Sequence, residues 1–216
     1  MKFASRQDAG RQLGKFLRKR GISADLVLGL PRGGVVVATE VARELKLPLD
    51  VLVVRKIGHP WHREFAVGAL AEPNVVILDE TTTRRFPVPR AELDNVIQEE
   101  MKRLREYRSR FHRVDMPLLK DKTVLLVDDG LATGATAEAA AASAKKQRAR
   151  RVIIAAPTAS IEAVGRLRKV ADDVEVLSAD PNFSAVGQFY EEFFQTSDDE
   201  VIALLRGAKA VEKNEK

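Results

Sequence analysis

Two adjacent carboxylates, Asp128 and Asp129, open the segment of this chain that is best suited to chemistry. They follow the apolar run Val124-Leu125-Leu126-Val127, which is typical of a buried strand. Open α/β sheets bind ligands beyond the carboxyl ends of their strands, so we expect both carboxylates to meet a polar ligand. Two like charges without a bridging partner are costly to hold together, and the pair therefore favours a ligand that contacts both.

Small and hydroxylated residues follow the acid pair and predict an anion site. Thr133-Gly134-Ala135-Thr136 offers backbone N–H groups and two hydroxyls where a helix begins, which suits a single phosphate. Ribose hydroxyls could donate hydrogen bonds to Asp128 and Asp129, and a Mg²⁺ ion held by pyrophosphate oxygens would lie near them, directly or through water. The structural alternative is that Asp129 caps the following turn and Asp128 pairs with an arginine.

The elements that position these residues alternate along the chain. From Asp25, short β-branched runs alternate with helical patterns, which indicates an α/β fold with an open, mainly parallel, doubly wound sheet flanked by helices. Residues 66–71 and 75–78 predict two further short strands around a turn. The predicted main strands are residues 25–30, 49–54, 123–127, 152–156 and 174–177, and the predicted helices between them are 35–45, 135–147 and 161–170.

Four segments lie outside this alternation. Gly58 to Glu64 mixes glycine, proline, aromatic and charged residues, and it predicts a mobile loop. Arg90 to His112 has apolar residues three or four positions apart, and it predicts a long amphipathic helix that serves packing or an oligomer contact. Residues 1–24 predict a leading helix that ends at Gly21, and the aromatic tail from Asp180 predicts a short helix after Ser197.

Composition limits the classes of protein to which this chain can belong. The 216 residues are 45% apolar and 31% charged with a net charge of +5, which fits one globular domain and an anionic partner, polyphosphate and nucleic acid alike. Without cysteine the chain has no disulfide framework, thiolate nucleophile or cysteine-based metal site. We find no signal-like segment and no apolar run of about 20 residues, so we expect a cytoplasmic protein that does not bind a membrane.

The segment Val124 to Thr136 resembles the signature with which type I phosphoribosyltransferases bind phosphoribosyl pyrophosphate (PRPP). The resemblance implies that Asp128 and Asp129 hold the ribose 2′ and 3′ hydroxyls close to the substrate-bound Mg²⁺. It also implies that the 5′-phosphate lies in the loop formed by Ala132, Thr133, Gly134, Ala135 and Thr136.

Two other segments carry the same resemblance. Pro31-Arg32-Gly33-Gly34 resembles the family's pyrophosphate loop, in which glycines let backbone N–H groups approach an anion. Arg55 and Lys56, followed by the predicted loop, resemble the basic strand end and flexible catalytic loop of adenine and orotate phosphoribosyltransferases. They would neutralise the departing pyrophosphate while the loop excludes water. No role is assigned to His59, His62, Arg63 and Glu64 in that loop.

The resemblance also implies a domain organisation and a place for the acceptor. We expect residues 1–216 to form one domain, with a core at about 25–177, a helical insertion at about 88–118, and a hood from about 1–24 and 178–216. The tail 185–190 looks like a bacterial branch of the family without an assigned acceptor. Phe183 and Tyr190 could stack on a planar acceptor or could be ordinary core aromatics. The hypoxanthine-guanine enzymes carry an acid at the position of Ala132, so that residue cannot protonate a purine.

These observations lead to one expected function and two alternatives. We expect an enzyme of nucleotide salvage that uses Mg²⁺ and moves the 5-phosphoribosyl group from PRPP to a small, nucleobase-like nitrogen acceptor, and that forms a homo-oligomer. A PRPP- or nucleotide-sensing regulator that binds nucleic acid is the first alternative, permitted by the basic segment Lys102 to Arg113, although no nucleic-acid motif is present. A hydrolase or phosphorylase that uses the same pocket is the second.

Overall fold

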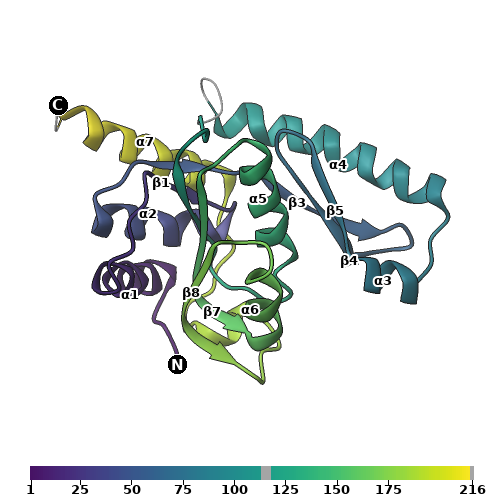
Figure 1. The fold of residues 1–216 in the computed structure, drawn as a ribbon, viewed down its shortest axis with the longest axis horizontal. Helices are drawn as coiled ribbons and strands as arrows, with labels where there is room; N and C mark the ends of the chain where they lie inside the picture. The colour runs from purple at the N-terminus through teal and green to yellow at the C-terminus, as the bar shows by residue number, and fades with distance from the viewer. Residues whose placement is uncertain (113–117, 215–216) are drawn as a thin grey trace.

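The computed structural model describes residues 1–112 and 118–214 and contains two sheets. Figure 1 shows helices on both faces of a central sheet and an arm that projects from it. The predicted insertion at 88–118 is described only in part, because residues 113–117 lie outside the described residues. Within the described part of the chain, we find no helix that combines the length and the apolar character needed to span a membrane.

The central sheet is entirely parallel, in the order β2-β1-β6-β7-β8. Helices α1 (Arg6–Lys19) and α2 (Gly33–Leu45) pack on one face, and α5 (Ala135–Lys146) and α6 (Ile161–Leu167) pack on the other. This arrangement confirms the predicted α/β fold class. The strands are β1 (Leu26–Gly29), β2 (Leu49–Val51), β6 (Thr123–Val127), β7 (Arg151–Ser160) and β8 (Asp173–Asp180).

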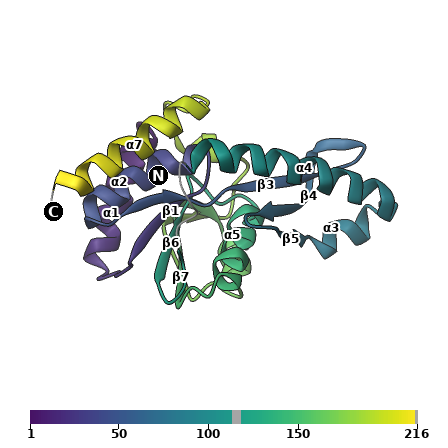
Figure 2. The ribbon, with the colours of Figure 1, turned by 90° about the horizontal axis from the view of Figure 1, so that it is seen from above.

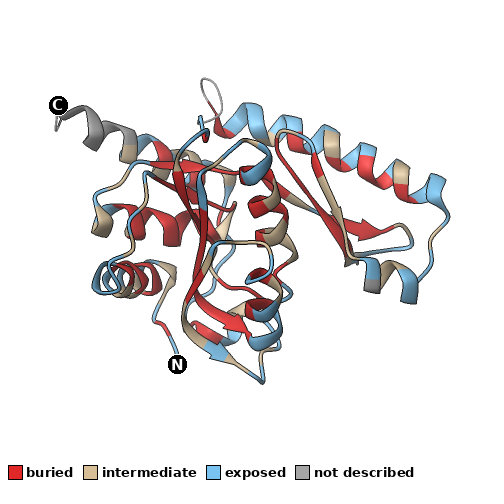
Figure 3. Cartoon of the chain, viewed as in Figure 1, coloured by how far each residue is buried: buried red, intermediate tan, exposed pale blue. Residues whose placement is uncertain are grey.

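Side-chain alternation in the central strands explains the two cores. Val27, Leu125 and Ile153 face α1 and α2, whereas their neighbours Leu126 and Ile154 face α5 and α6. Strands buried on both faces read as continuous apolar runs, which is why the sequence revealed them. Figure 3 shows this burial along the central strands and on the inward side of the flanking helices.

The arm is the structure formed by residues 54–111. Its antiparallel sheet contains β3 (Val54–His59), β4 (His62–Ala71) and β5 (Val75–Leu78), followed by α3 (Glu80–Arg85) and α4 (Arg90–Phe111). Helix α4 packs along this sheet, as Figure 2 shows from above. The two predicted short strands and the long amphipathic helix are confirmed, and the buried residues of α4 include Leu93, Val96, Ile97 and Leu104.

Two expectations fail, one where the arm begins and one at its tip. The predicted strand 49–54 is divided, because β2 ends at Val51 and Val54 begins β3 in the other sheet. The predicted mobile loop Gly58 to Glu64 is a β-hairpin, in which His59 pairs with His62 around a turn at Pro60 and Trp61. The register shifts at Gly58, where an added Cβ would clash with the backbone of Arg63. These irregularities mask the alternation by which a strand is recognised.

The N-terminal segment and the tail around Phe189 meet beside the central sheet. Helix α1 begins after Ser5, buries Leu13 and Leu17, and is followed by Gly21 at φ +68°, as predicted. Phe3 N–H donates to the carbonyl of Phe189, and Glu191 N–H donates to the carbonyl of Phe3. The tail contains η1 (Val186–Phe189) and α7 (Asp198–Asn214), and α7 is longer than the short helix that we expected.

A buried charged cluster lies where the arm joins the central sheet. The fully buried Glu72 accepts hydrogen bonds from Val53 N–H at 2.7 Å and from His112 Nε2 at 2.9 Å. His112 Nδ1 lies 3.6 Å from Asp50, and Arg108 lies 3.9 Å from Glu72. Burial lowers the pKa of His112, but Asp50 and Glu72 outweigh it and raise that pKa to about 9. The imidazolium therefore ties α4 to both sheets.

Candidate active site

The acid corner is the site formed by the loops Pro31–Gly34 and Asp128–Thr136. Strands β1 and β6 are parallel neighbours with Gly29 opposite Val127, so both loops leave the same edge of the sheet. A Cβ on Gly34 would lie 2.8 Å from Asp128 Oδ1, and a Cβ on Gly33 would overlap Asp129 Oδ2. Glycine is therefore required at both positions for the loops to approach this closely. The peptide bond between Pro31 and Arg32 in the first loop is cis.

Asp128 is an acid with a raised pKa. Its Oδ1 accepts a hydrogen bond from Asp129 N–H at 2.8 Å. Burial and then the negative charge of Asp129 raise the pKa of Asp128 well above its ordinary value, and the positive charge of Lys56 partly offsets this rise. A carboxylate in this state is stabilised by any ligand that brings hydrogen-bond donors or a cation, which is the chemistry that the sequence predicted here.

Asp129 has a partner that the sequence did not reveal. Arg6 Nε donates to Asp129 Oδ2 at 2.7 Å, and Tyr190 Oη donates to the Asp129 carbonyl at 2.6 Å. The structural alternative paired Asp128 with an arginine, whereas the arginine found here pairs with Asp129. No local signal could have indicated Arg6, because it is 123 residues away in the sequence and lies among several other basic residues.

The predicted phosphate loop leads directly into α5. Gly134 precedes the helix at φ +76°, a conformation that favours glycine. The end of β7 braces this loop, since Leu131 N–H donates to the Thr158 carbonyl and Ser160 Oγ donates to the Ala132 carbonyl. Ala132 and Thr133 are exposed, and Ala135 and Thr136 are half-buried in the first turn of α5, so an anion can reach this helix start.

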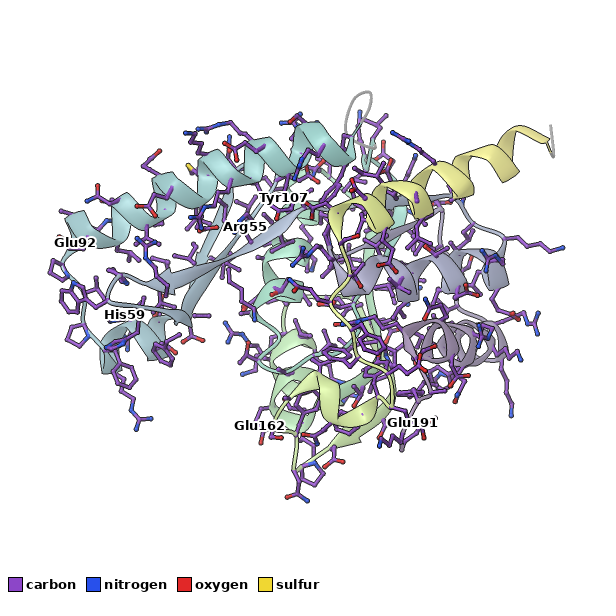
Figure 4. All side chains as sticks on the ribbon, turned by 180° about the vertical axis from the view of Figure 1, so that it is seen from behind. Arg55, His59, Glu92, Tyr107, Glu162 and Glu191 are labelled. Atoms are coloured by element: carbon purple, nitrogen blue, oxygen red, sulfur yellow. The ribbon has the colours of Figure 1, made fainter. Side chains whose placement is uncertain are left out.

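Arg55 and Lys56 diverge although they are neighbours. Consecutive residues of a strand point to opposite faces, and Arg55 turns to α4, where Nε donates to Glu100 at 2.5 Å. Its guanidinium also lies 5.0 Å from the ring centre of Tyr107, and Figure 4 shows these two residues together. Lys56 is exposed and acts electrostatically on Asp128. The structure thus brings Lys56, but not Arg55, to the acid corner.

Arg32 connects the first loop of the acid corner to α7. Its guanidinium lies 3.7 Å from Asp198, and Arg110 of α4 lies 2.7 Å from the same carboxylate. The side chain of Arg32 keeps a third of its surface exposed. Because the pair with Asp198 is long, Arg32 can exchange it for an anionic ligand at little cost.

The two predicted acceptor residues differ in exposure. Tyr190 is 4% exposed and packs between Phe3 and Phe193, so it offers no open ring face. Phe183 is half-buried against Phe189. A cavity of about 140 Å³ lies beside the acid corner, between the start of α1 and the tail, and its lining includes Arg6, Gln7, Val36, Glu192, Phe194 and Thr196.

The hairpin residues without an assigned role lie at the tip of the arm. His59 is buried there, and it packs against Trp61, His62 and Phe65. These aromatics and Phe86 border a cavity of about 410 Å³ that is separate from the acid corner, and Figure 4 places His59 at the far end of the arm. Arg63 pairs with Glu99, and the side chain of Glu64 lies outside the described residues.

The donor set of the acid corner fits a Mg²⁺ ion that arrives with the substrate. Among the side chains that the structure describes, no group of three or more histidine, aspartate or glutamate residues could hold a metal ion. Asp128 and Asp129 provide two carboxylates beside the anion loops, which is enough for an ion whose remaining ligands are phosphate oxygens and water.

Comparison with known proteins identifies the domain. Residues 4–194 match the family model described as the phosphoribosyl transferase domain. Sequences from the CDC 1551 and H37Rv strains of Mycobacterium tuberculosis are 45% identical over 204 residues, and their names provisionally assign them as phosphoribosyl transferases. Each match covers 94% of this chain and 46% of the relative, so the chain spans about half the length of these relatives.

Solved structures share the fold. The crystal structure of TT1426 from Thermus thermophilus is 43% identical, has a TM-score of 0.79, and is matched over 95% of this chain and 98% of that chain. The AQ2163 protein from Aquifex aeolicus is 14% identical with a TM-score of 0.52, over 84% of this chain and 78% of that chain, and this likeness shows the fold alone.

Proposed function

Because this chain belongs to the phosphoribosyl transferase domain family, we propose that it transfers the 5-phosphoribosyl group of PRPP to a nitrogen acceptor and releases pyrophosphate. The observation that carries this proposal is the acid corner, where two adjacent carboxylates lie against one glycine loop and directly precede another. A sugar that carries hydroxyls, a 5′-phosphate and a pyrophosphate matches these groups in number and charge.

Each group of PRPP has a proposed partner. Asp128 and Asp129 accept hydrogen bonds from the two ribose hydroxyls, and the loop from Ala132 to Thr136 binds the 5′-phosphate. The glycine loop with Arg32 binds the pyrophosphate, and Lys56 neutralises charge on it. Mg²⁺ enters as part of the PRPP complex, where it neutralises the pyrophosphate near Asp128 and Asp129. Catalysis then rests on positioning and on charge complementarity.

The transfer exchanges one bond of the ribose C1 atom for another. The bond from C1 to the pyrophosphate oxygen breaks, and the pyrophosphate leaves with the electron pair. The acceptor nitrogen forms the new bond to C1 and loses its proton to solvent. Positive charge that develops on the ribose lies close to the two carboxylates, which stabilise it, while Arg32 and Lys56 stabilise the opposite charge on the leaving group.

Two of the predicted site residues take different proposed roles. Arg55 is held by Glu100 and Tyr107, so we assign it to the attachment of α4 rather than to the pyrophosphate. Tyr190 is buried and bonded to the Asp129 backbone, so we assign it to positioning that acid. Phe183 stays a candidate for stacking on the acceptor, in a hood formed by residues 1–24 and 178–216 over a core at about 25–177.

The regulatory alternative receives no support. Two arginines of the basic segment in α4 have close acidic partners, since Arg103 pairs with Glu100 and Arg110 pairs with Asp198. Arg113 lies outside the described residues. Paired charges attract nucleic acid less than free ones do. We therefore propose a homo-oligomeric cytoplasmic enzyme of nucleotide salvage, with PRPP and a small acceptor as its partners.

A panel of nucleobases tests the proposed activity. The chain is incubated with PRPP, Mg²⁺ and one base at a time, and pyrophosphate release is followed. Release that depends on one base supports the transferase and names its acceptor. Release at the same rate without any base indicates a hydrolase instead, and failure to bind PRPP in calorimetry contradicts the proposal altogether.

A further inference from the structure

Arg6 lies at the centre of the contacts that join the N-terminal segment and the tail around Phe194 to the acid corner. Its side chain is 11% exposed, and the carboxylate of Asp129 that it bonds is 16% exposed. Arg6 Nη1 donates to the Phe194 carbonyl at 2.6 Å, and the guanidinium lies 3.9 Å from the ring centre of Phe193. One side chain thus contacts Asp129 and the tail at the same time.

These contacts fix the guanidinium in a single place. Its Nε and Nη1 atoms have different partners, and the ring of Phe193 covers one face of the group. A Cβ on Gly33 would lie 2.7 Å from Arg6 Nε, so the pyrophosphate loop packs against the ion pair as well. A planar group with this many fixed contacts is well suited to orient a carboxylate.

The orientation of Asp129 matters for ribose binding. Arg6 bonds only Oδ2 of Asp129, and Oδ2 is the oxygen that faces Gly33. The carboxylate can therefore keep this bond and accept a sugar hydroxyl at Oδ1. Without Arg6, the carboxylate could rotate or repel Asp128 more strongly, and both changes would weaken ribose binding.

We propose that Arg6 is a positioning residue for the ribose of PRPP. Arg6 holds one oxygen of the Asp129 carboxylate, so that the other oxygen is presented to the sugar. This inference rests on the proposed function, because it requires that the acid pair binds ribose. It adds a residue from outside the binding loops, and it gives the leading helix α1 a role in substrate binding.

Two ligands separate this role from a merely structural one. Mg²⁺·PRPP needs Asp129 for its ribose, whereas Mg²⁺·pyrophosphate has no ribose and binds through the glycine loop, Arg32 and Lys56, while the charge of Arg6 is taken up by Asp129. In Arg6→Gln, we expect calorimetry to show PRPP affinity at least tenfold weaker and pyrophosphate affinity within twofold of the wild type. The matched control is Arg11→Gln on the same helix, because Arg11 is half exposed and lies 3.7 Å from its acidic partner, Asp8.

The outcomes distinguish the inference from the proposed function. If the wild type binds PRPP and Arg6→Gln binds it equally well, the inference is wrong and the proposed function stands. Equal loss of both ligands in Arg6→Gln would mean that Arg6 supports the whole site rather than the ribose, and would also overturn the inference. If Arg6→Gln does not fold, Arg6→Lys decides: lysine keeps the charge but lacks the planar guanidinium that directs Nε to Asp129 and Nη1 to Phe194. We expect it to lose PRPP affinity selectively, and wild-type PRPP affinity in that variant would overturn the inference.

Discussion

The acid corner and the tip of the arm both gather polar and aromatic side chains, but the two regions are built differently. In the acid corner, Arg6 bonds the carboxylate of Asp129 and Tyr190 bonds its backbone carbonyl, and glycines admit the neighbouring loop. At the tip, Trp61 is 60% exposed, Phe65 is 42% exposed and Phe86 is 43% exposed around a cavity. Fixed polar contacts indicate a site prepared for charged chemistry, whereas exposed aromatics alone indicate only a surface that can be covered.

The junction between the arm and the central sheet allows stability and ligand binding to be tested separately. The cluster of Glu72, His112 and Asp50 attaches the arm to the central sheet and lies apart from the binding loops in the chain. Changes in that cluster should alter stability, and changes in the acid corner should alter ligand binding.

Glu72→Ala should have the largest effect. The change removes the acceptor for Val53 N–H and leaves a buried His112 imidazolium without its closest carboxylate. Breaking a buried pair in this way costs about 3 to 5 kcal/mol of unfolding free energy. Urea denaturation measures the loss, and Glu72→Gln is the control, since the amide keeps an acceptor and should cost less. An Ala variant as stable as the wild type would show that the cluster does not hold the arm.

His112 should make the stability depend on pH in the alkaline range. Its pKa is about 9 in the folded chain and 6.5 when unperturbed, so the folded state binds the additional proton. The stabilisation is therefore complete below about pH 6.5, falls as the pH rises, and is lost above pH 9. The total is on the order of 3 kcal/mol at 1.36 kcal/mol per pKa unit. His112→Gln should flatten the profile from pH 6.5 to 9 in denaturation experiments, and an unchanged slope would contradict the assignment.

Lys56→Met and Arg55→Met should separate chemistry from packing. Loss of one group that stabilises a leaving group typically slows turnover by about a hundredfold, which is the effect expected for Lys56. Arg55→Met should mainly lower stability, because Glu100 loses one of its two arginine partners. The rate of pyrophosphate release and the free energy of unfolding are measured for both variants. Trp61→Ser at the arm tip is the control, and we expect it to change neither quantity. Equal kinetic losses in the two variants would restore Arg55 to the pyrophosphate site.

The raised pKa of Asp128 should give PRPP binding a mild pH dependence. Ribose hydroxyls and Mg²⁺ bind the charged carboxylate, so affinity falls as the pH drops through that raised pKa and binding releases a proton. The slope approaches about tenfold per pH unit only below that pKa. Calorimetry measures the affinities for PRPP and for pyrophosphate at each pH, and their ratio corrects for the protonation of the ligand's own phosphate groups. If the pH dependence of PRPP affinity is identical in Asp128→Asn, another group causes it.

The sequence predicted the acid corner more fully than the arm, and the reason is physical. Asp128, Asp129 and the glycine loops follow buried parallel strands, and both the apolar runs and the breaks after them are local signals. The hairpin around Pro60 was missed because its irregular register and mixed residues hide the strand alternation. Arg6 was missed because its value comes from a contact over 123 residues, which no local pattern contains.

Calorimetry of Mg²⁺·PRPP with the wild type and with the double variant Asp128→Asn, Asp129→Asn tests the central claim most directly. The substitutions keep the side-chain shape and remove both charges, and circular dichroism checks that the variant is folded. We predict measurable binding to the wild type and none to the variant. Equal PRPP affinity in the two proteins would contradict the assignment of the acid corner.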